Sequence, residues 1–146
     1  MTLSVRTAVS SLAGFLLALS GIAMAQSSGT VKKAPAPQTS PASGAAMFKA
    51  YCAACHGADG KGNGPAAADL KQKPADLTTL AKRHDGKFPD AYVAGVLRFG
   101  VKSPSHGSSD MPVWGPLLTV ISGHDPSQVE MRITNLTSYL RSIQAK

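Results

Sequence analysis

Two cysteines and a histidine lie within one short run, Cys52-Ala53-Ala54-Cys55-His56, and this run carries the chemistry of the sequence. C-x-x-C-H is the attachment motif of a c-type haem. In that motif both thiols form thioethers with the haem vinyl groups, and the adjacent imidazole ligates the iron. The three-residue step between the cysteines places both sulfurs on one face of a helical turn. We therefore expect Cys52 and Cys55 to hold one covalent haem c, with His56 as an axial ligand of its iron.

Three other chemistries use a closely spaced pair of cysteines. A thioredoxin-like redox pair lies in a βαβ context, whereas the flanks here indicate a helix before the motif and a glycine-rich loop after it. A structural zinc site needs four ligands, and the histidines outside the motif lack metal-finger spacing. A disulfide across C-x-x-C closes a very small loop and contributes little stability through loop entropy. These comparisons favour haem attachment.

A helix must present this motif, and the flanking residues predict one. Residues 44–51 (GAAMFKAY) are rich in alanine, which favours helix, and Phe48 lies one turn before Cys52. The next segment, residues 57–65, contains four glycines and a proline, a composition that excludes regular structure. Such glycines either let the backbone pass close to a bulky ligand or serve as the turn residues of a surface loop.

Two further helices are predicted towards the C-terminus. Over residues 89–99 the apolar side chains fall at helical spacing, and Gly100 ends the pattern. Asp125 is a candidate N-cap for the last helix, with Pro126 at its first position. No segment shows the period-two alternation of a strand, so we predict an all-α domain. The apolar stripe of the last helix, which predicts its core face, consists of Val129, Ile133, Leu136, Leu140 and Ile143.

The first 25 residues have the features of a secretory signal peptide. Arg6 supplies a positive n-region, residues 12–24 are mostly apolar, and Ala23-Met24-Ala25 forms an A-x-A cleavage site. We expect cleavage after Ala25 and export, most simply to the periplasm. The alternative is a retained membrane anchor, although the serines that interrupt this stretch leave it short for a spanning helix.

The remaining chain divides into a linker and one domain. Residues 26–43 are rich in Pro, Ser and Thr and predict a flexible linker, because they bury too little apolar surface to become ordered. Residues 44–146 have the length of one domain. This domain holds twelve Lys and Arg against eight Asp and Glu, a net charge of +4, which favours acidic partners. The domain has no basic run with interleaved aromatics, the pattern that would indicate nucleic-acid binding.

The order of these features resembles a class I c-type cytochrome. The resemblance covers residues 44–146: Gly44 and Phe48 before C-x-x-C-H, a Gly/Pro loop, a middle helix, Met111-Pro112, and a Leu-rich last helix with Tyr139-Leu140. Members of that family are small helical domains in which the terminal helices cross and enclose one haem. The resemblance implies that Gly44 and Phe48 meet the last helix near Tyr139 and Leu140.

The same resemblance implies a second axial ligand from a Met-Pro loop beyond the middle helix. Met111 lies 55 residues after His56, in a loop before the last helix. A thioether is a soft ligand that favours ferrous iron and raises the reduction potential. His106, in the same loop, is the competing ligand and would lower the potential. We expect Met111.

Three further residues are candidates around the haem. A ligating imidazole usually donates its other N–H to a carbonyl, and the resemblance implies the backbone carbonyl of Pro65. Trp114 either packs on the haem or donates to a propionate, with simple core packing as the alternative. Arg98 is a candidate to neutralise a propionate, although a solvated helix position is the simpler interpretation.

With both axial positions filled, the site exchanges electrons and catalyses no bond change. The resemblance therefore implies a monomeric, soluble single-electron carrier, not an enzyme, that acts between an exported protein donor and acceptor. One alternative is a cytochrome subunit of a membrane-associated dehydrogenase or oxidase, which a retained N-terminal helix would favour. A haem enzyme or gas sensor would need an open sixth position. Docking on acidic partners would use lysines at Lys61, Lys71, Lys73 and Lys102.

Overall fold

The computed structural model describes residues 36–101 and 111–146. The described residues belong to one compact unit, which spans residues 34–146. Features predicted from the sequence that lie outside the described residues are the signal peptide (1–25), the first part of the linker (26–35), Lys102 and His106.

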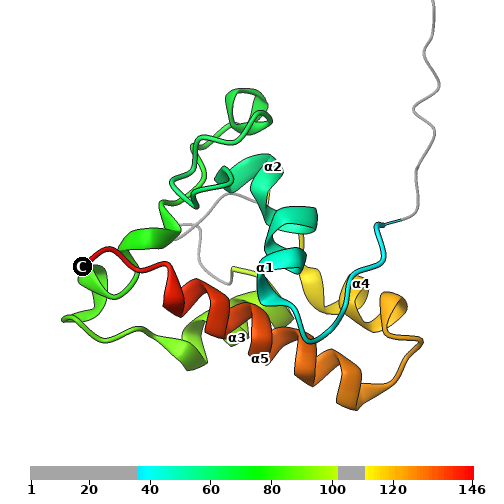
Figure 1. Cartoon of the computed structure of the whole chain (residues 1–146). Coiled ribbons are helices and arrows are strands. Elements are labelled where there is room, and N and C mark those ends of the chain that lie inside the picture. Colours follow the sequence, from blue (N-terminus) through cyan, green and yellow to red (C-terminus); the bar gives the residue numbers. More distant parts are fainter. Residues whose placement is uncertain (1–35, 102–110) are drawn as a thin grey trace, which may run out of the picture. The chain divides into compact units, whose positions relative to one another are not determined.

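Every regular element in residues 36–101 and 111–146 is helical, so the predicted all-α class is confirmed for this part of the chain. Figure 1 shows the helices enclosing the middle of the domain, with the last helix running across the first. In chain order the elements are α1 (Gly44–Met47), η1 (Phe48–Cys52), α2 (Ala53–His56), η2 (Ala67–Asp69), η3 (Leu77–Thr79), η4 (Lys82–His84), α3 (Asp90–Phe99), α4 (Trp114–Ile121) and α5 (Pro126–Ser142).

The helix predicted before the haem motif is present, but it widens in the middle. The side chain of Ser43 caps its start by accepting from the amide of Ala46. Element η1 is a π-helical turn, and the amide of Ala53 donates to the carbonyl of Phe48, five residues earlier. Such single wide turns are frequent at functional sites. This one ends at Cys52, the first cysteine of the motif.

Helix α5 begins as the sequence predicts and crosses α1. The carboxylate of Asp125 accepts from the amide of Ser127, and proline occupies the first turn. Gly44 lies so close to α5 that a Cβ there would overlap the carbonyl oxygen of Asn135. The rings of Phe48 and Tyr139 lie 5.2 Å apart between centroids. The predicted meeting of Gly44 and Phe48 with Tyr139 is thus present.

The core forms between the first helical segment, α3, α4 and α5. Of the predicted stripe on α5, three residues are buried, and Val129 and Ile143 pack partly buried against them. On α3, Tyr92 is exposed even though it belongs to the apolar pattern. The buried hydrophobic residues of these four elements are Met47, Phe48, Tyr51, Cys52, Val93, Leu97, Leu118, Ile133, Leu136 and Leu140.

Helix α4 was not predicted from the sequence, which indicated a loop up to the last helix. Its sequence, WGPLLTVI, contains a glycine and a proline, residues that usually interrupt helices. Pro116 is tolerated because it lies in the first turn, where its missing N–H would have no partner within the helix. Gly115 allows α4 to approach α3, since a Cβ there would overlap the carbonyl oxygen of Arg98.

The end of the predicted linker is held against the helices. The hydroxyl of Tyr51 donates to the carbonyl of Pro37 at 2.6 Å and lies 2.8 Å from Oγ1 of Thr39. The buried guanidinium of Arg132 also donates to Thr39 Oγ1, at 3.1 Å. The side-chain Nδ2 of Asn135 donates to the carbonyl of Pro41 at 2.9 Å. Residues 36–43 therefore belong to the folded domain, which begins before the predicted boundary at residue 44.

The crossing of α1 and α5 gives a prediction with opposite signs at two helical glycines. Gly44→Ala is expected to lower the free energy of unfolding by about 1–3 kcal/mol, because its Cβ overlaps the Asn135 carbonyl. On α3, a Cβ at Gly95 would meet nothing within 4 Å. Gly95→Ala is therefore expected to raise the free energy of unfolding by about 0.5–1 kcal/mol. Denaturant titration of both purified variants measures the difference. Equal effects would contradict a tight crossing at Gly44.

Candidate functional site

The three residues of the haem motif lie in one turn, at the junction of η1 and α2. Cys52 ends η1 and is buried, Cys55 is partly buried, and His56 ends α2 and is buried. No disulfide joins the two cysteines. Burial and, to a smaller extent, the neighbouring Cys55 together raise the pKa of the Cys52 thiol to about 12. Both sulfurs and the imidazole therefore belong to one short helical segment, as the spacing predicts.

The ring of His56 is oriented by one hydrogen bond. Its Nδ1 lies 3.0 Å from the carbonyl oxygen of Ala75, so Nδ1 carries the proton and Nε2 is the nitrogen able to bind iron. Burial lowers the pKa of His56, and the bond to Ala75 opposes that shift. The result is a neutral imidazole with its lone pair on Nε2, the form that metals bind.

The acceptor of this hydrogen bond differs from the one we expected. The resemblance implied the carbonyl of Pro65, but the structure shows Ala75 in that role. Pro65 is exposed in the loop after α2. The amides of this loop donate to the last carbonyls of α2. A later segment supplies the carbonyl that accepts from His56. The sequence signal for this segment was the pair Asp76 and Thr78, a helix-capping pattern two residues apart.

The glycine-rich loop closes the C-terminal end of α2. A helix leaves its last four carbonyls without partners inside the helix, and here those of residues 53–56 all accept from loop amides at 2.7–3.1 Å. The donors, in the order of these acceptors, are the amides of Gly57, Ala66, Gly64 and Gly62. The loop therefore packs on the haem-motif helix itself.

Close packing explains why this loop needs glycine. At Gly64 a Cβ would overlap the carbonyl oxygens of both Ala54 and Ala53. At Gly62, where φ is +76°, a Cβ would overlap the carbonyl oxygen of Pro74. Of the two interpretations of the glycines, close approach is supported at both positions, but the group approached is protein backbone.

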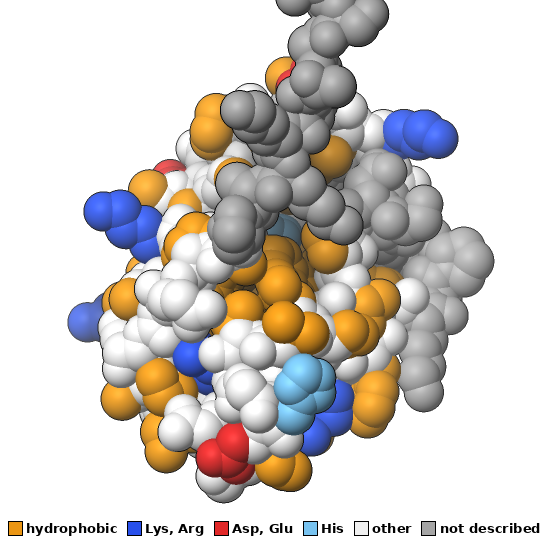
Figure 2. All heavy atoms as spheres, turned by 90° about the vertical axis from the view of Figure 1, so that its right-hand side faces the viewer, with side chains coloured by type: hydrophobic (Ala, Val, Ile, Leu, Met, Phe, Trp, Pro, Cys, Tyr) orange, Lys and Arg blue, Asp and Glu red, His pale blue; other side chains and the backbone are white. Residues whose placement is uncertain are grey.

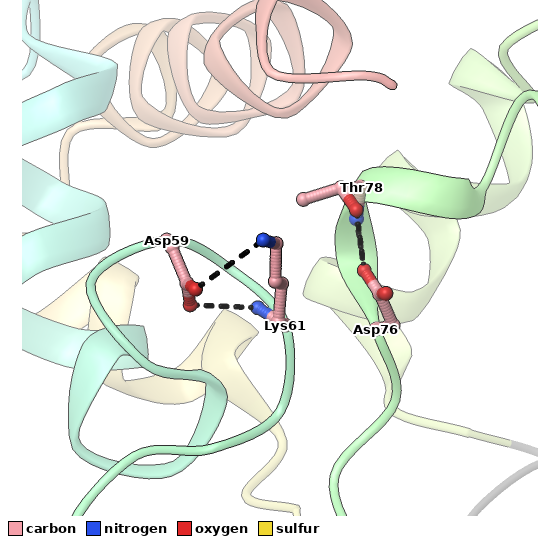
Figure 3. Close-up of polar contacts among 4 residues, drawn as sticks. All are labelled: Asp59, Lys61, Asp76 and Thr78. Carbon is pink, nitrogen blue, oxygen red and sulfur yellow. Dashed lines mark hydrogen bonds and ion pairs between the residues drawn. The ribbon is translucent and has the colours of Figure 1, made fainter. Parts of the chain in front are cut away.

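The segment that carries Ala75 is tied to this loop and stiffened by its own cap. The amide of Leu77 donates to the carbonyl of Gly60 at 2.7 Å. The carboxylate of Asp76 accepts from the amide of Thr78 at 2.8 Å and from its hydroxyl at 2.6 Å. Figure 3 shows the cap facing the Asp59–Lys61 contact of the glycine loop. The hydroxyl of Thr78 in particular holds the pKa of Asp76 below its ordinary value.

Three further candidates, Trp114, Met111 and Arg98, lie outside the motif segment. The ring of Trp114 lies 5.9 Å from that of Tyr51, so the start of α4 packs against η1. Met111 is partly buried and precedes α4 by three residues. Arg98 pairs with Glu130 at 2.6 Å, so its guanidinium is engaged between α3 and α5.

The residues present fit a covalently bound haem. Two thiols lie three residues apart, and a neutral histidine follows them with Nδ1 engaged and Nε2 facing away from that bond. Figure 2 shows hydrophobic side chains gathered in a hollow on one face of the domain, a surface suited to a largely apolar ring. This combination of thiols, oriented imidazole and apolar surface is the donor set that a haem c requires.

A small helical domain with these features is a c-type cytochrome domain. Residues 39–122 match the family described as "Cytochrome C oxidase, cbb3-type, subunit III". Because this match covers more than half of the chain, the chain belongs to that family of monohaem, class I c-type cytochrome domains. The matched range begins within residues 36–43, the end of the predicted linker, and ends just before α5.

Family membership establishes the general role of the domain. One haem c is attached at Cys52 and Cys55, and the domain transfers electrons. Domains of this family are typically electron carriers and not enzymes, their partners are redox proteins, and c-type cytochromes are generally extracytoplasmic. No curated protein and no solved structure matches the chain. Within residues 36–101 and 111–146 no helix has both the length and the apolar character needed to cross a membrane.

The closure of α2 by the loop gives a second prediction. Gly64→Ala is expected to lower the free energy of unfolding by about 1–3 kcal/mol, because its Cβ overlaps the carbonyls of Ala53 and Ala54. The yield of haem-loaded protein should fall with it. Ala58→Ser, at an exposed position of the same loop, is the control and should change neither. Haem absorbance per polypeptide and denaturant titration measure both effects; a normal Gly64→Ala protein would contradict the packing.

Proposed function

We propose that this domain passes single electrons between a protein donor and a protein acceptor outside the cytoplasmic membrane, with His56 and Met111 as the two axial ligands of its iron. The observation that carries the proposal is the orientation of His56, whose Nδ1 is bonded to Ala75 at 3.0 Å. A buried, oriented imidazole presents one nitrogen in one direction. It needs no rearrangement when the iron changes charge, which suits electron transfer.

Each proposed ligand has a defined part in this role. The haem, when bound, supplies an iron that cycles between ferric and ferrous forms. His56 binds it through Nε2, while the Ala75 carbonyl holds the ring and raises its basicity. Met111 supplies a thioether that favours the ferrous form. Its place supports this role: it is partly buried and lies three residues before Trp114, which packs on the motif helix through Tyr51.

The charge of the domain supports docking on acidic partners. Its net charge of +4 attracts acidic surfaces and raises association rates more than affinity. Lys71 and Lys73 are exposed and follow η2. Lys61 is exposed as well, although Asp59 lies 3.9 Å from its ammonium group and offsets part of its charge. These three exposed lysines are the docking candidates within the described residues.

A second role is favoured by the family match. The family's description names a subunit of a cbb3-type oxidase, so this chain is also a candidate for a cytochrome subunit of a membrane-associated oxidase or dehydrogenase complex. Both roles use the same haem site and the same electron transfer. They differ in whether the N-terminal apolar stretch is removed or retained as an anchor.

The proposed ligation predicts the behaviour of two methionine variants. In the native ferric protein we expect a sulfur-to-iron charge-transfer band and no binding of carbon monoxide to the ferrous form. Met111→Ala should remove the band, open the site to carbon monoxide and lower the reduction potential. Met131→Ala, at an exposed position on α5, should leave all three properties unchanged. The measurements are absorption spectra and a redox titration.

Any of three results would contradict this ligation. A native protein that binds carbon monoxide readily and lacks the band would have an open sixth position, as a haem enzyme or sensor needs. A band that survives Met111→Ala would mean that another sulfur ligates the iron. A spectrum typical of two histidines in the native protein would point to His106.

The N-terminus of the mature protein distinguishes the free carrier from the complex subunit. Cleavage of a signal peptide after Ala25 predicts a mature chain that begins at Gln26. The intact mass of the haem-loaded protein, isolated from cells that make it from the full sequence, measures this directly. An intact mass that corresponds to a chain beginning at Met1, with the protein in the membrane fraction, would support the anchored subunit and contradict the free carrier.

A further inference from the structure

The side chain of Gln144 joins the C-terminal end of the domain to the segment that orients His56. Its Nε2 donates to the carbonyl of Leu77 at 2.7 Å and to that of Leu140 at 2.7 Å. Its Oε1 accepts from the amide of Ala81 at 2.8 Å. One partly buried amide therefore holds both ends of residues 77–81 against the last turn of α5.

The backbone reinforces this connection one residue later. The amide of Ala145 donates to the carbonyl of Thr78 at 2.8 Å. In Figure 1 the C-terminal end of the chain lies beside the segment around residue 80. Residues 144 and 145 thus bind η3 and the residues that follow it, and the glycine loop binds the same segment at Leu77.

A displacement of η3 would also displace the backbone of Ala75. Ala75 precedes Leu77 by two residues, and the residue between them, Asp76, is bonded through its side chain to both the amide and the hydroxyl of Thr78. The Asp76 carbonyl in turn accepts from Thr79 Oγ1 at 3.1 Å. The turn is therefore stiff, and the position of the Ala75 carbonyl follows the position of η3.

We propose that Gln144 is a positioning residue for the haem site, which sets the hydrogen bond between Ala75 and His56 and through it the reduction potential of the iron. The inference rests on the proposed ligation by His56. Gln144 touches neither the haem motif nor the iron ligands; it acts through Leu77, Ala81 and the stiff turn at Asp76.

The direction of the effect follows from the chemistry of the imidazole. A strong bond from Nδ1–H to a carbonyl makes the ring more basic, and a more basic ligand stabilises ferric iron relative to ferrous iron. Loss of the Gln144 bonds releases η3 and the Ala75 carbonyl with it. The Nδ1 bond then lengthens, the ring becomes less basic, and the reduction potential rises.

The test compares Gln144→Leu with Gln128→Leu in the haem-loaded protein. Gln144→Leu keeps most of the side-chain volume and removes all three hydrogen bonds, whereas Gln128 is the other glutamine at α5 and lies in its first turn. We expect Gln144→Leu to raise the potential in a redox titration. The NMR signal of the His56 Nδ1 proton should shift and exchange faster with solvent. Gln128→Leu should change neither.

A lower free energy of unfolding with an unchanged potential and Nδ1 signal would overturn the proposal, since Gln144 would then only fasten the C-terminus. If Gln144→Leu does not load haem, Gln144→Glu decides the question. It keeps the acceptor for Ala81 and loses the donors to Leu77 and Leu140, so the same rise in potential supports the proposal and a native potential overturns it. Failure of the proposed ligation would be visible separately, as a native protein without the signals of an iron-bound histidine.

Discussion

The rest of the site depends on one constraint: the helix that carries the haem motif ends on His56, the histidine of that motif. A helix end leaves four carbonyls without partners, and a ligating imidazole needs an acceptor for its second nitrogen. The glycine loop meets the first need with four amides. The next segment meets the second with the carbonyl of Ala75. Two adjoining stretches of chain therefore do this work: one pairs the last carbonyls of α2, and the next orients the ring of His56.

The two ends of the domain stabilise this arrangement. Gly44 allows α1 to lie against α5, and the rings of Phe48 and Tyr139 pack beside the crossing. Before α1, residues 36–43 are bonded to Tyr51, Arg132 and Asn135. After α5, Gln144 and Ala145 are bonded to the segment that follows Ala75. Because both ends of the domain are bonded to segments around the haem motif, they restrict the movement of those segments.

This geometry is consistent with either a free carrier or a subunit of a larger complex. Both require a haem whose histidine is buried, neutral and held in one direction, and burial lowers the pKa of His56 towards that state. The chain belongs to a family whose description names an oxidase subunit, and this description favours the second role. The two differ in the treatment of the N-terminal stretch, not in the chemistry of the site.

The sequence by itself determined the features that depend on neighbours along the chain. These were the C-x-x-C-H turn, the middle helix, predicted over 89–99 and observed over 90–99, the Asp125 cap with its apolar stripe, and the all-α class of the described residues. Such features follow from helical periodicity and local capping. Only the tertiary structure decided that α4 forms despite Gly115 and Pro116, that residues 36–43 are bound, and that Ala75 replaces Pro65 beside His56. Each of these depends on contacts between segments far apart in the sequence, where one backbone meets another and no local pattern records the meeting.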